Sequence, residues 1–526
     1  MNFKLSSILI FLIFTLVGFA LYLPSLNYGF YLDDSFQIVT NRLVHDISSW
    51  YLNFTRSTVD QGGSEAPGGI YYKPIMMIAY SLLWNITPNE TISFRVFQLI
   101  LHAANASMIF IVFKNLFSKE RIIFSLLVGF IFFLHPMNSE AVVFIADLQE
   151  PLFSFFGLIA LLILIKSQSK YSVYLASIFL LGSVLSKESG LLYILVCCTY
   201  YLLFKKDHWC HLIVSLVVVA GVYFTLRFGF AELNAVHSNT MQISRADFLT
   251  RLMTMPKVLV HYIHLFFWPQ EISLTQDWIV KRISIQDFWL PLIEVIAIVC
   301  LSLVYIARTK DKVFILFFLW FGFGWGLHSQ LIPLDGTVSD RWFYFTMVGF
   351  LGMMMTFISS EFRIQLSRIL LMGALLLAGL TLRTHARILN WKDPLTLYTH
   401  DLTVDPESFY LNNNAGIEYF NTKRYKQAIP YFEKTVLNTV EKSREWYAGV
   451  ANLGAIYLFL GQLNEAEGFL RIAIVNGDVK AYRAYAGTLL ELNKKKEFFE
   501  FLEKIALIKY PNDPVLIKLK NSTGGS

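Results

Sequence analysis

Charged residues are scarce in this chain of 526 residues. Asp, Glu, Lys and Arg make up 16% of it and hydrophobic residues 55%, whereas soluble globular proteins carry about 25% charged residues. Neither sign is in large excess, because 44 basic residues accompany 38 acidic ones. A net charge of +6 that is dispersed along the chain does not indicate a nucleic-acid partner. The composition predicts a polytopic membrane protein whose basic residues serve as topology signals.

Cysteine is also rare. The four cysteines, Cys197, Cys198, Cys210 and Cys300, all lie within or beside apolar runs. None of them forms a C-x-x-C pair or another metal-binding spacing. The sequence therefore argues against both a disulfide framework and a cysteine-ligated metal.

Long apolar runs, in contrast, are abundant, and we interpret eleven of them as membrane spans. We read the first as a retained span rather than a cleaved signal peptide. A further apolar stretch, 252–268, carries histidines and basic residues and is interpreted as a helix lying in the membrane interface. The eleven predicted spans are 5–23, 93–117, 121–136, 150–166, 171–186, 189–204, 211–229, 289–307, 313–331, 341–360 and 367–384.

Clusters of Lys and Arg recur after every second span, which places them all in the cytoplasm if the N-terminus is cytoplasmic. The loop 24–92 and everything after about residue 385 then lie outside. That loop is rich in aromatic residues and contains two adjacent carboxylates, Asp33 and Asp34. Its stretch from Gln61 to Gly69 has no apolar anchor, so we expect a mobile segment or lid there.

After Trp391 the sequence changes to amphipathic helices with a repeating pattern. The glycines Gly416, Gly454 and Gly487 are 38 and 33 residues apart, which brackets the roughly 34-residue tetratricopeptide period. The pattern predicts a short superhelix whose concave face holds an extended peptide, or else a structural cap without a ligand. The matching positions are Gly416, Tyr419, Ala428 and Phe432 in the first copy and Gly454, Tyr457, Ala466 and Leu470 in the second.

Several short segments, taken in order, resemble the transmembrane and tetratricopeptide-repeat O-mannosyltransferases and their bacterial relatives. The segments are Asn27-Tyr28-Gly29-Phe30-Tyr31-Leu32-Asp33-Asp34, Tyr72-Lys73-Pro74, Leu101-His102-Ala103-Ala104-Asn105-Ala106, Leu134-His135-Pro136 with Glu140-Ala141-Val142, Ser186-Lys187-Glu188-Ser189-Gly190, Leu331-Ile332-Pro333-Leu334 with Asp340-Arg341-Trp342-Phe343-Tyr344, and Asn390-Trp391-Lys392-Asp393. The family tends to have Arg where this chain has Lys73.

The resemblance implies an all-α fold: a polytopic membrane helix bundle of the GT-C glycosyltransferase type, followed by the tetratricopeptide superhelix. The expected layout is a catalytic domain over 1–386, a connector over 387–404 and a repeat domain over 405–521 that faces outside. The implied activity is transfer of a hexose, typically mannose, from a polyprenyl-phosphate donor to a protein hydroxyl at the outer face.

Such a transfer needs a base for the acceptor hydroxyl and cations for the departing phosphate. We expect Asp33 to be the base, so that the anomeric centre inverts. Asp34 would orient the acceptor or sugar, or raise the proton affinity of its neighbour. Arg341, Lys73 and Lys187 are the candidates for binding the donor phosphate. The residues expected to bind substrate or support the site are Glu188, Glu140, His102 and His135.

Each of these residues also has a structural interpretation: a solvated loop pair for the aspartates, an interfacial anchor for Arg341, and hydrogen-bonded packing for the histidines. We expect no obligatory metal or other cofactor, although paired carboxylates can bind a divalent cation. The expected partners are the lipid-linked sugar, a protein or peptide acceptor and the bilayer, without nucleic acid. A bacterial inner membrane is favoured over the endoplasmic reticulum.

Two other functions stay open at this point. One is a transferase that modifies a lipid-linked glycan or an envelope polymer. The other is a membrane scaffold or transporter that uses the repeats as a docking arm, although a transporter would more often show polar residues deep within several spans.

Overall fold

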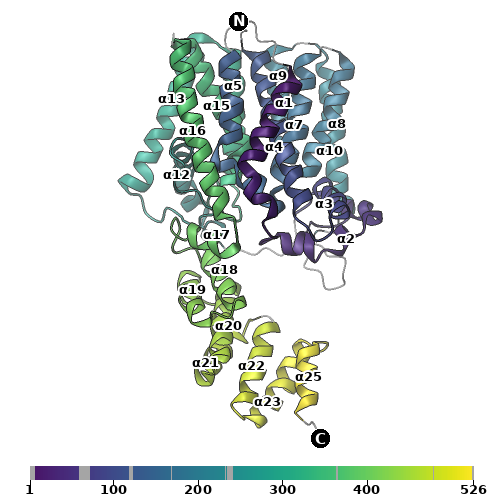
Figure 1. Ribbon diagram of the computed structural model, residues 1–526, viewed down its shortest axis with the longest axis vertical. Helices are drawn as coiled ribbons and strands as arrows, with labels where there is room; N and C mark the ends of the chain where they lie inside the picture. Colours follow the sequence, from purple (N-terminus) through teal and green to yellow (C-terminus); the bar gives the residue numbers. More distant parts are fainter. Residues whose placement is uncertain are drawn as a thin grey trace. The chain divides into compact units, whose positions relative to one another are not determined.

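The computed structural model of the chain consists of helices, turns and irregular segments, without a β-strand among the residues that it describes. Those residues are 6–58, 71–117, 122–167, 169–205, 207–231, 233, 241–362, 365–477 and 479–523. The chain divides into two compact units, Met1–Asp393 and Pro394–Ser526, which we call the membrane unit and the C-terminal unit (Figure 1). The prediction of an all-helical chain is confirmed for the described residues.

The membrane unit is a bundle of apolar helices (Figure 1). Seven helical segments in the described part of the chain are long and apolar enough to cross a bilayer, and an eighth if the bent pair Ile122–Leu134 and Pro136–Val143 counts as one span. The chain is thus a multi-pass membrane protein. The seven lie over α1 (Ser7–Tyr22), α4 (Ile92–Leu116), α7 (Gln149–Lys166), α10 (Trp209–Phe224), α13 (Leu290–Thr309), α15 (Phe343–Glu361) and α16 (Leu366–Asn390) with their adjoining turns, and the bent pair begins with α5 (Ile122–Leu134).

The remaining three predicted spans are helical but shorter. They form α8 (Lys170–Ser186), α9 (Leu191–Phe204) and α14 (Lys312–His328). All eleven predicted segments are therefore helices, while length and composition support seven or eight crossings. The count of eleven crossings stays a prediction.

The stretch interpreted as an interfacial helix forms α12 (Phe248–Phe267), which is not among the candidate spans. Asp247 caps it by accepting a hydrogen bond from the Thr250 N–H at 2.6 Å. Its polar side chains form ion pairs at the protein surface, such as Lys257 with Asp287 at 2.8 Å. The short helix α11 (Gln242–Arg245) precedes it, and the π-helical turns η8 (Thr225–Phe230) and η9 (Ile285–Trp289) adjoin α10 and α13.

The described residues of the loop 24–92 are mostly helical, and they include an apolar helix that the sequence analysis missed. This helix, α3 (Pro74–Ile86), begins with proline, whose fixed φ suits a first helical turn. Tyr80 and Trp84 on its buried face pack with residues of α4 and α7. The predicted lid, Gln61 to Gly69, lies outside the described residues. The other elements of this loop are η1 (Leu23–Asn27), η2 (Ser35–Val39), α2 (Arg42–His45) and η3 (Ile47–Phe54).

Short turns join several of the bundle helices, and some of their charged residues are buried. Glu140, Asp147 and Asp340 lie in such turns and are each at most 3% exposed. A charge at that depth needs a partner, so these turns are where a site is expected. The turns are η5 (Pro136–Asn138), α6 (Glu140–Val143), η6 (Ile145–Asp147), η7 (Glu188–Gly190) and η10 (Asp340–Trp342).

The C-terminal unit consists of successive helices in which small residues face large ones. A Cβ on Gly416 would lie 2.8 Å from the ring of Phe432, and one on Gly454 would lie 2.5 Å from Leu470. The paired helices therefore approach closely at these glycines. The tetratricopeptide superhelix itself stays a prediction. The helices are α17 (Pro394–Asp401), α18 (Phe409–Asn421), α19 (Tyr425–Asn438), α20 (Arg444–Phe459), α21 (Leu463–Ala473), α22 (Val479–Glu491), α23 (Lys495–Phe501), η11 (Leu502–Ala506), α24 (Leu507–Lys509) and α25 (Pro514–Ser522).

Candidate active site

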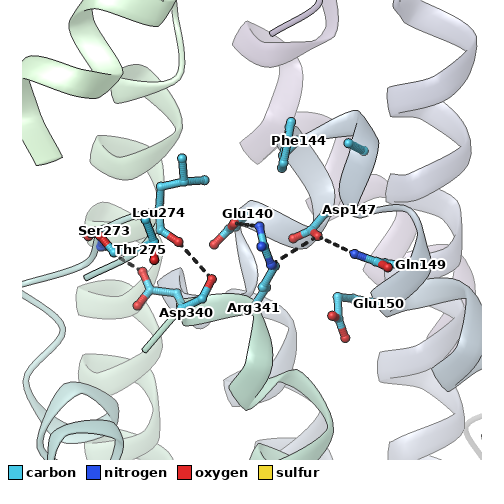
Figure 2. A network of polar contacts seen from close by, with 12 residues as sticks. Glu140, Phe144, Asp147, Gln149, Glu150, Ser273, Leu274, Thr275, Asp340 and Arg341 are labelled. Atoms are coloured by element: carbon cyan, nitrogen blue, oxygen red, sulfur yellow. Dashed lines mark hydrogen bonds and ion pairs between the residues drawn. The ribbon is translucent and has the colours of Figure 1, made fainter. Parts of the chain in front are cut away.

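Arg341 lies between two buried carboxylates from separate turns of the membrane unit (Figure 2). Its Nη1 donates to Oε1 of Glu140 at 2.9 Å, and its Nε lies 3.6 Å from Oδ1 of Asp147. The two carboxylate side chains are 3% and 1% exposed, whereas the guanidinium side chain is 25% exposed. The cation thus neutralises charges behind it while one of its sides stays accessible. The structure brings together Arg341 and Glu140, two of the residues predicted for the site.

The backbone that carries Arg341 is fixed by its neighbours. Oδ2 of Asp340 accepts a hydrogen bond from the Ser273 N–H at 3.0 Å, as Figure 2 shows. The Tyr262 hydroxyl of α12 donates to the Ser339 carbonyl at 3.0 Å and accepts from its N–H at 3.1 Å. These contacts hold η10 against α12, so that α12 contributes to the orientation of Arg341.

The two adjacent aspartates have different environments. Asp34 is completely buried, and its two oxygens accept hydrogen bonds from the N–H groups of Tyr31 at 2.9 Å and Ala146 at 2.8 Å. Burial raises the pKa of Asp34 to about 7, and the two N–H donors and Arg95 oppose that rise. Asp34 therefore connects the loop 24–92 to the turn that carries Asp147.

Arg95 makes a second connection between the same two segments. This buried side chain of α4 donates through Nη2 to the Gly29 carbonyl at 2.7 Å and through Nε to the Val143 carbonyl at 3.2 Å, and its Nη1 donates to Tyr28. Together with Asp34 it fixes the position of the loop segment that leads to Asp33.

Asp33 is partly buried, and its carboxylate has no hydrogen bond or ion pair to any residue of the described segments. Burial raises its pKa, and the positive charges of Arg341 and Lys73 oppose this effect. The charges of Asp147 and Asp335 act in the same direction as burial and raise the pKa further. The carboxylate that was predicted to be the base is thus one on which the charges of Arg341 and Lys73 act to lower the pKa, although it forms no hydrogen bond or ion pair with any described residue.

Lys73 is a cation without a close counter-ion. It is 8% exposed, its Nζ lies 4.6 Å from the centre of the Tyr71 ring, and within the described residues it forms no ion pair. Burial lowers the pKa of Lys73 to about 8, the charge of Glu188 opposes this, and the positive charges of Lys187 and Arg341 lower it further. Tyr71 also hydrogen-bonds Asp335 through its hydroxyl.

The other predicted polar residues form ion pairs next to this group. Lys187 pairs with Glu150, whose side chain is only 3% exposed. Glu188 accepts a hydrogen bond from Arg227 at 2.7 Å and a weaker one from the Tyr72 N–H at 3.5 Å. Lys187 and Glu188 therefore do not pair with each other; each binds a residue from another helix.

Both predicted histidines make hydrogen bonds between helices. His102 of α4 bonds the Phe133 carbonyl through Nε2 at 3.1 Å and the Tyr344 hydroxyl through Nδ1 at 2.9 Å. Because a carbonyl only accepts, Nε2 carries the proton and Nδ1 accepts. His135 likewise bonds the Phe266 carbonyl at 3.0 Å. These contacts match the packing interpretation and leave their substrate role a prediction.

Sequence reasoning missed Asp147, Arg227 and Asp335. The only signal for the first two was a charged residue at the end of a long apolar run, a position that is also typical of an ordinary span boundary. Among the described residues, no group of three or more His, Cys, Asp or Glu side chains is placed to hold a metal ion.

Comparison with known proteins identifies related sequences at low identity. The chain is 23% identical to the human protein O-mannosyl-transferase TMTC3 over 499 residues, which cover 85% of this chain and 53% of the human protein. It is 23% identical over 408 residues to the protein O-mannosyl-transferase F38B6.6 of Caenorhabditis elegans, covering 75% of this chain and 58% of that protein. The chain thus spans little more than half the length of these relatives.

No protein-family model and no solved structure matches the chain. Over most of its length, the chain is a distant homologue of the protein O-mannosyltransferases.

Proposed function

We propose that this protein is an integral-membrane glycosyltransferase that transfers a hexose, with mannose favoured, from a polyprenyl-phosphate donor to a hydroxyl of a protein acceptor at the extracytoplasmic face. The distant homology to protein O-mannosyltransferases supports the reaction class. The observation that carries the proposal is the environment of Asp33, whose carboxylate forms no hydrogen bond or ion pair with the described residues and is subject to the positive charges of Arg341 and Lys73.

In the proposed reaction Asp33 accepts the proton of the acceptor hydroxyl. The acceptor oxygen forms a bond to the anomeric carbon while the bond from that carbon to the phosphate oxygen breaks. The leaving group is the polyprenyl phosphate, and its developing charge is stabilised by nearby cations. One displacement inverts the anomeric centre, so an α-linked donor gives a β-linked product and a β-linked donor an α-linked one.

The two cations have different roles in this proposal. Lys73 forms no ion pair with a residue that the structure describes and is therefore the better placed to accept a new anionic partner. Arg341 is already paired with two carboxylates and offers only its accessible side. Oε2 of Glu140 and Oδ2 of Asp147 are buried and have no hydrogen-bond partner among the described residues. Lys187 is a third, supporting cation.

The test uses the purified full-length protein with radiolabelled polyprenyl-phosphate mannose and peptides that contain Ser and Thr. We expect labelled peptide from the wild type and a loss of about 10²–10⁴-fold in Asp33→Asn, the usual contribution of a positioned base. Asp207→Asn, which changes an exposed aspartate on another loop, is the matched control. Wild-type rates in Asp33→Asn would exclude Asp33 as the base.

The same assay separates the alternatives. Label that moves only to a lipid-linked glycan would indicate a transferase for that substrate instead. Absence of any donor turnover, together with intact partner binding or transport, would favour a scaffold or transporter. We further propose that the C-terminal unit binds the acceptor peptide, so removing the chain after about residue 405 should weaken acceptor use more than donor binding. Equal losses would indicate that this unit supports the membrane fold.

A further inference from the structure

One strained position in the backbone directly precedes Asp33. The φ angle of Leu32 is +47°, which lies in the left-handed region that residues other than glycine seldom adopt. Such a conformation persists only where the surrounding contacts hold it. We call residues 29–34 the Leu32 turn. Because Asp33 follows Leu32 immediately, the contacts that hold this turn also set the direction of the Asp33 side chain.

Tyr31 holds the Leu32 turn through three hydrogen bonds. Its hydroxyl accepts from the Gly29 N–H at 3.0 Å and donates to the Lys392 carbonyl at 2.9 Å. Its own N–H donates to Oδ2 of Asp34 at 2.9 Å. The side chain is buried, so these contacts are shielded from water. One tyrosine thus closes the turn on itself and joins it to a residue 361 positions later in the chain.

The residue that accepts from the tyrosine hydroxyl is itself well fixed. Lys392 follows Trp391, which is completely buried at the end of α16. The Trp391 ring stacks on Phe144, with ring centres 5.7 Å apart and planes inclined by 27°. Phe144 lies two residues before Ala146, whose N–H donates to Asp34. The end of α16 and the segment that binds Asp34 therefore support the Leu32 turn together.

Asp33 depends on this support because no contact fixes its carboxylate. The carboxylate forms no hydrogen bond or ion pair with a residue of the described segments, so its position follows that of the backbone. The Gln37 N–H donates to the Asp33 carbonyl at 2.9 Å, which secures the main chain after the turn. Before the turn, the hydroxyl of Tyr31 provides the link to the end of α16.

We propose that Tyr31 is a positioning residue of the candidate active site: its hydrogen bond to Lys392 holds the Leu32 turn and thereby directs the carboxylate of Asp33. The inference rests on the proposed function for the role of Asp33, and it adds a residue that acts through that carboxylate. It also makes the end of α16, where the chain leaves the membrane unit, part of the support for the base.

The first test measures hydrogen exchange of the full-length protein in nanodiscs, without any sugar donor. In the wild type we expect the amides of Gly29 and Tyr31 to be protected, although neither residue lies in a helix. Tyr31→Phe keeps the ring and removes the hydroxyl, so the Lys392 carbonyl and the Gly29 N–H lose their partner. We expect roughly ten-fold faster exchange over residues 28–37, the usual scale for the loss of a buried hydrogen bond.

Tyr51→Phe is the matched control for the exchange measurement, because it removes the hydroxyl of an exposed tyrosine in the same loop, 24–92. This variant should exchange as the wild type does. Unprotected amides at Gly29 and Tyr31 in the wild type, or equal exchange in the two variants, would overturn the proposal.

The second test measures sugar transfer in a double-variant cycle, which shows whether Tyr31 acts through Asp33. Tyr31→Phe should lower kcat roughly ten-fold and leave the KM of the donor unchanged, because a small displacement of a reacting group is costly to the rate. In the Asp33→Asn background the same substitution should cause no further loss. An equal loss in both backgrounds would overturn Tyr31 as a positioning residue for Asp33.

The two measurements separate this inference from the proposed function. Faster exchange in Tyr31→Phe, together with a wild type that transfers no sugar, would retain the support of the Leu32 turn and reject the glycosyltransferase. Sugar transfer by the wild type, together with unchanged exchange in Tyr31→Phe, would retain the glycosyltransferase and reject the role of Tyr31.

Discussion

The charged pairs around Arg341 in the membrane unit are far more buried than the most exposed charged pairs of the C-terminal unit. In the membrane unit, the carboxylate side chains of Glu140, Asp147 and Glu150 are 1–3% exposed where they meet their cations. In the C-terminal unit, Glu500 and Glu503 are 57% and 54% exposed where they pair with lysines. Exposed pairs are inexpensive to form and contribute little to stability, whereas a buried charge carries a large desolvation cost.

The difference in burial supports a functional site at the buried carboxylates of the membrane unit. Apolar side chains of similar size would often replace a buried ion pair without loss of stability. Because folding does not require them, we infer that the carboxylates buried at the ends of the bundle helices serve the function of the protein. The exposed pairs of the C-terminal unit need no such explanation.

Among the substitutions that test this comparison, we expect the largest loss of stability for one at Arg341. Arg341→Gln leaves Glu140 and Asp147 without their cation, so we expect about 3–5 kcal/mol lower free energy of unfolding, the usual loss when one partner of a buried pair is removed. Denaturant titration of the protein in detergent measures it. Arg341→Lys, which keeps the charge, should lose less.

A double variant provides the control for the Arg341 prediction. Arg341→Gln combined with Glu140→Gln removes a charge of each sign, so it should be more stable than the sum of the two single effects predicts. Strict additivity would mean that the pair is not coupled, and that the buried position of Glu140 has another cause.

The next effect separates two neighbours in the sequence. Asp34→Asn places an amide where two backbone N–H groups need acceptors, so one of them loses its partner, at a cost of about 1–3 kcal/mol. Asp33→Asn breaks no contact within the described residues and should leave the free energy of unfolding nearly unchanged while activity falls. Thermal unfolding of the two variants side by side makes the measurement. Equal destabilisation would contradict the different environments found for the two carboxylates.

The sequence predicted much of the fold because membrane helices are encoded locally. A long apolar run with basic ends is sufficient to place α4 or α16, and both are helical where they were expected. The sequence analysis missed α3 because it treated residues 24–92 as a single loop, and the burial of α3 depends on contacts with α4 and α7 that the local sequence does not show. Local sequence predicts that α8, α9 and α14 are apolar helices, but it does not establish that helices of 14 to 17 residues cross the membrane.

The candidate site was predicted in part for a different reason. Asp33 and Arg341 are charged residues next to long apolar runs, so their residue types and positions were sufficient to predict them as site residues. The ion-pair partners of these residues come from distant segments and cannot be predicted from the local sequence. That Arg341 meets Glu140 and Asp147, and that Glu188 meets Arg227 rather than Lys187, depends on how the turns pack.

A smaller effect concerns pH and the two groups that have no ion pair. Asp33 must be deprotonated to accept a proton, and its raised pKa places the acid limb of activity above the roughly pH 3.9 of a free aspartate. Lys73 must be protonated to bind phosphate, and its pKa of about 8 makes activity fall as the pH rises through 8. Rates across this range should give a bell-shaped profile. In Lys73→Arg the basic limb should move to higher pH, because guanidinium stays charged; an unchanged limb would assign it to another group.

The smallest effect is expected at the surface of the C-terminal unit. Lys504 and Glu500 form an exposed pair one helical turn apart, at 2.8 Å. Glu500→Gln removes the charge and keeps the size, and since solvent screens both groups, we expect no measurable change in unfolding or in sugar transfer. Glu150→Gln, the same substitution beside Lys187, should reduce both properties. If the two substitutions had equal effects, burial would not distinguish the charged pairs of the two units, and the inference from buried charge to chemistry would lose its basis.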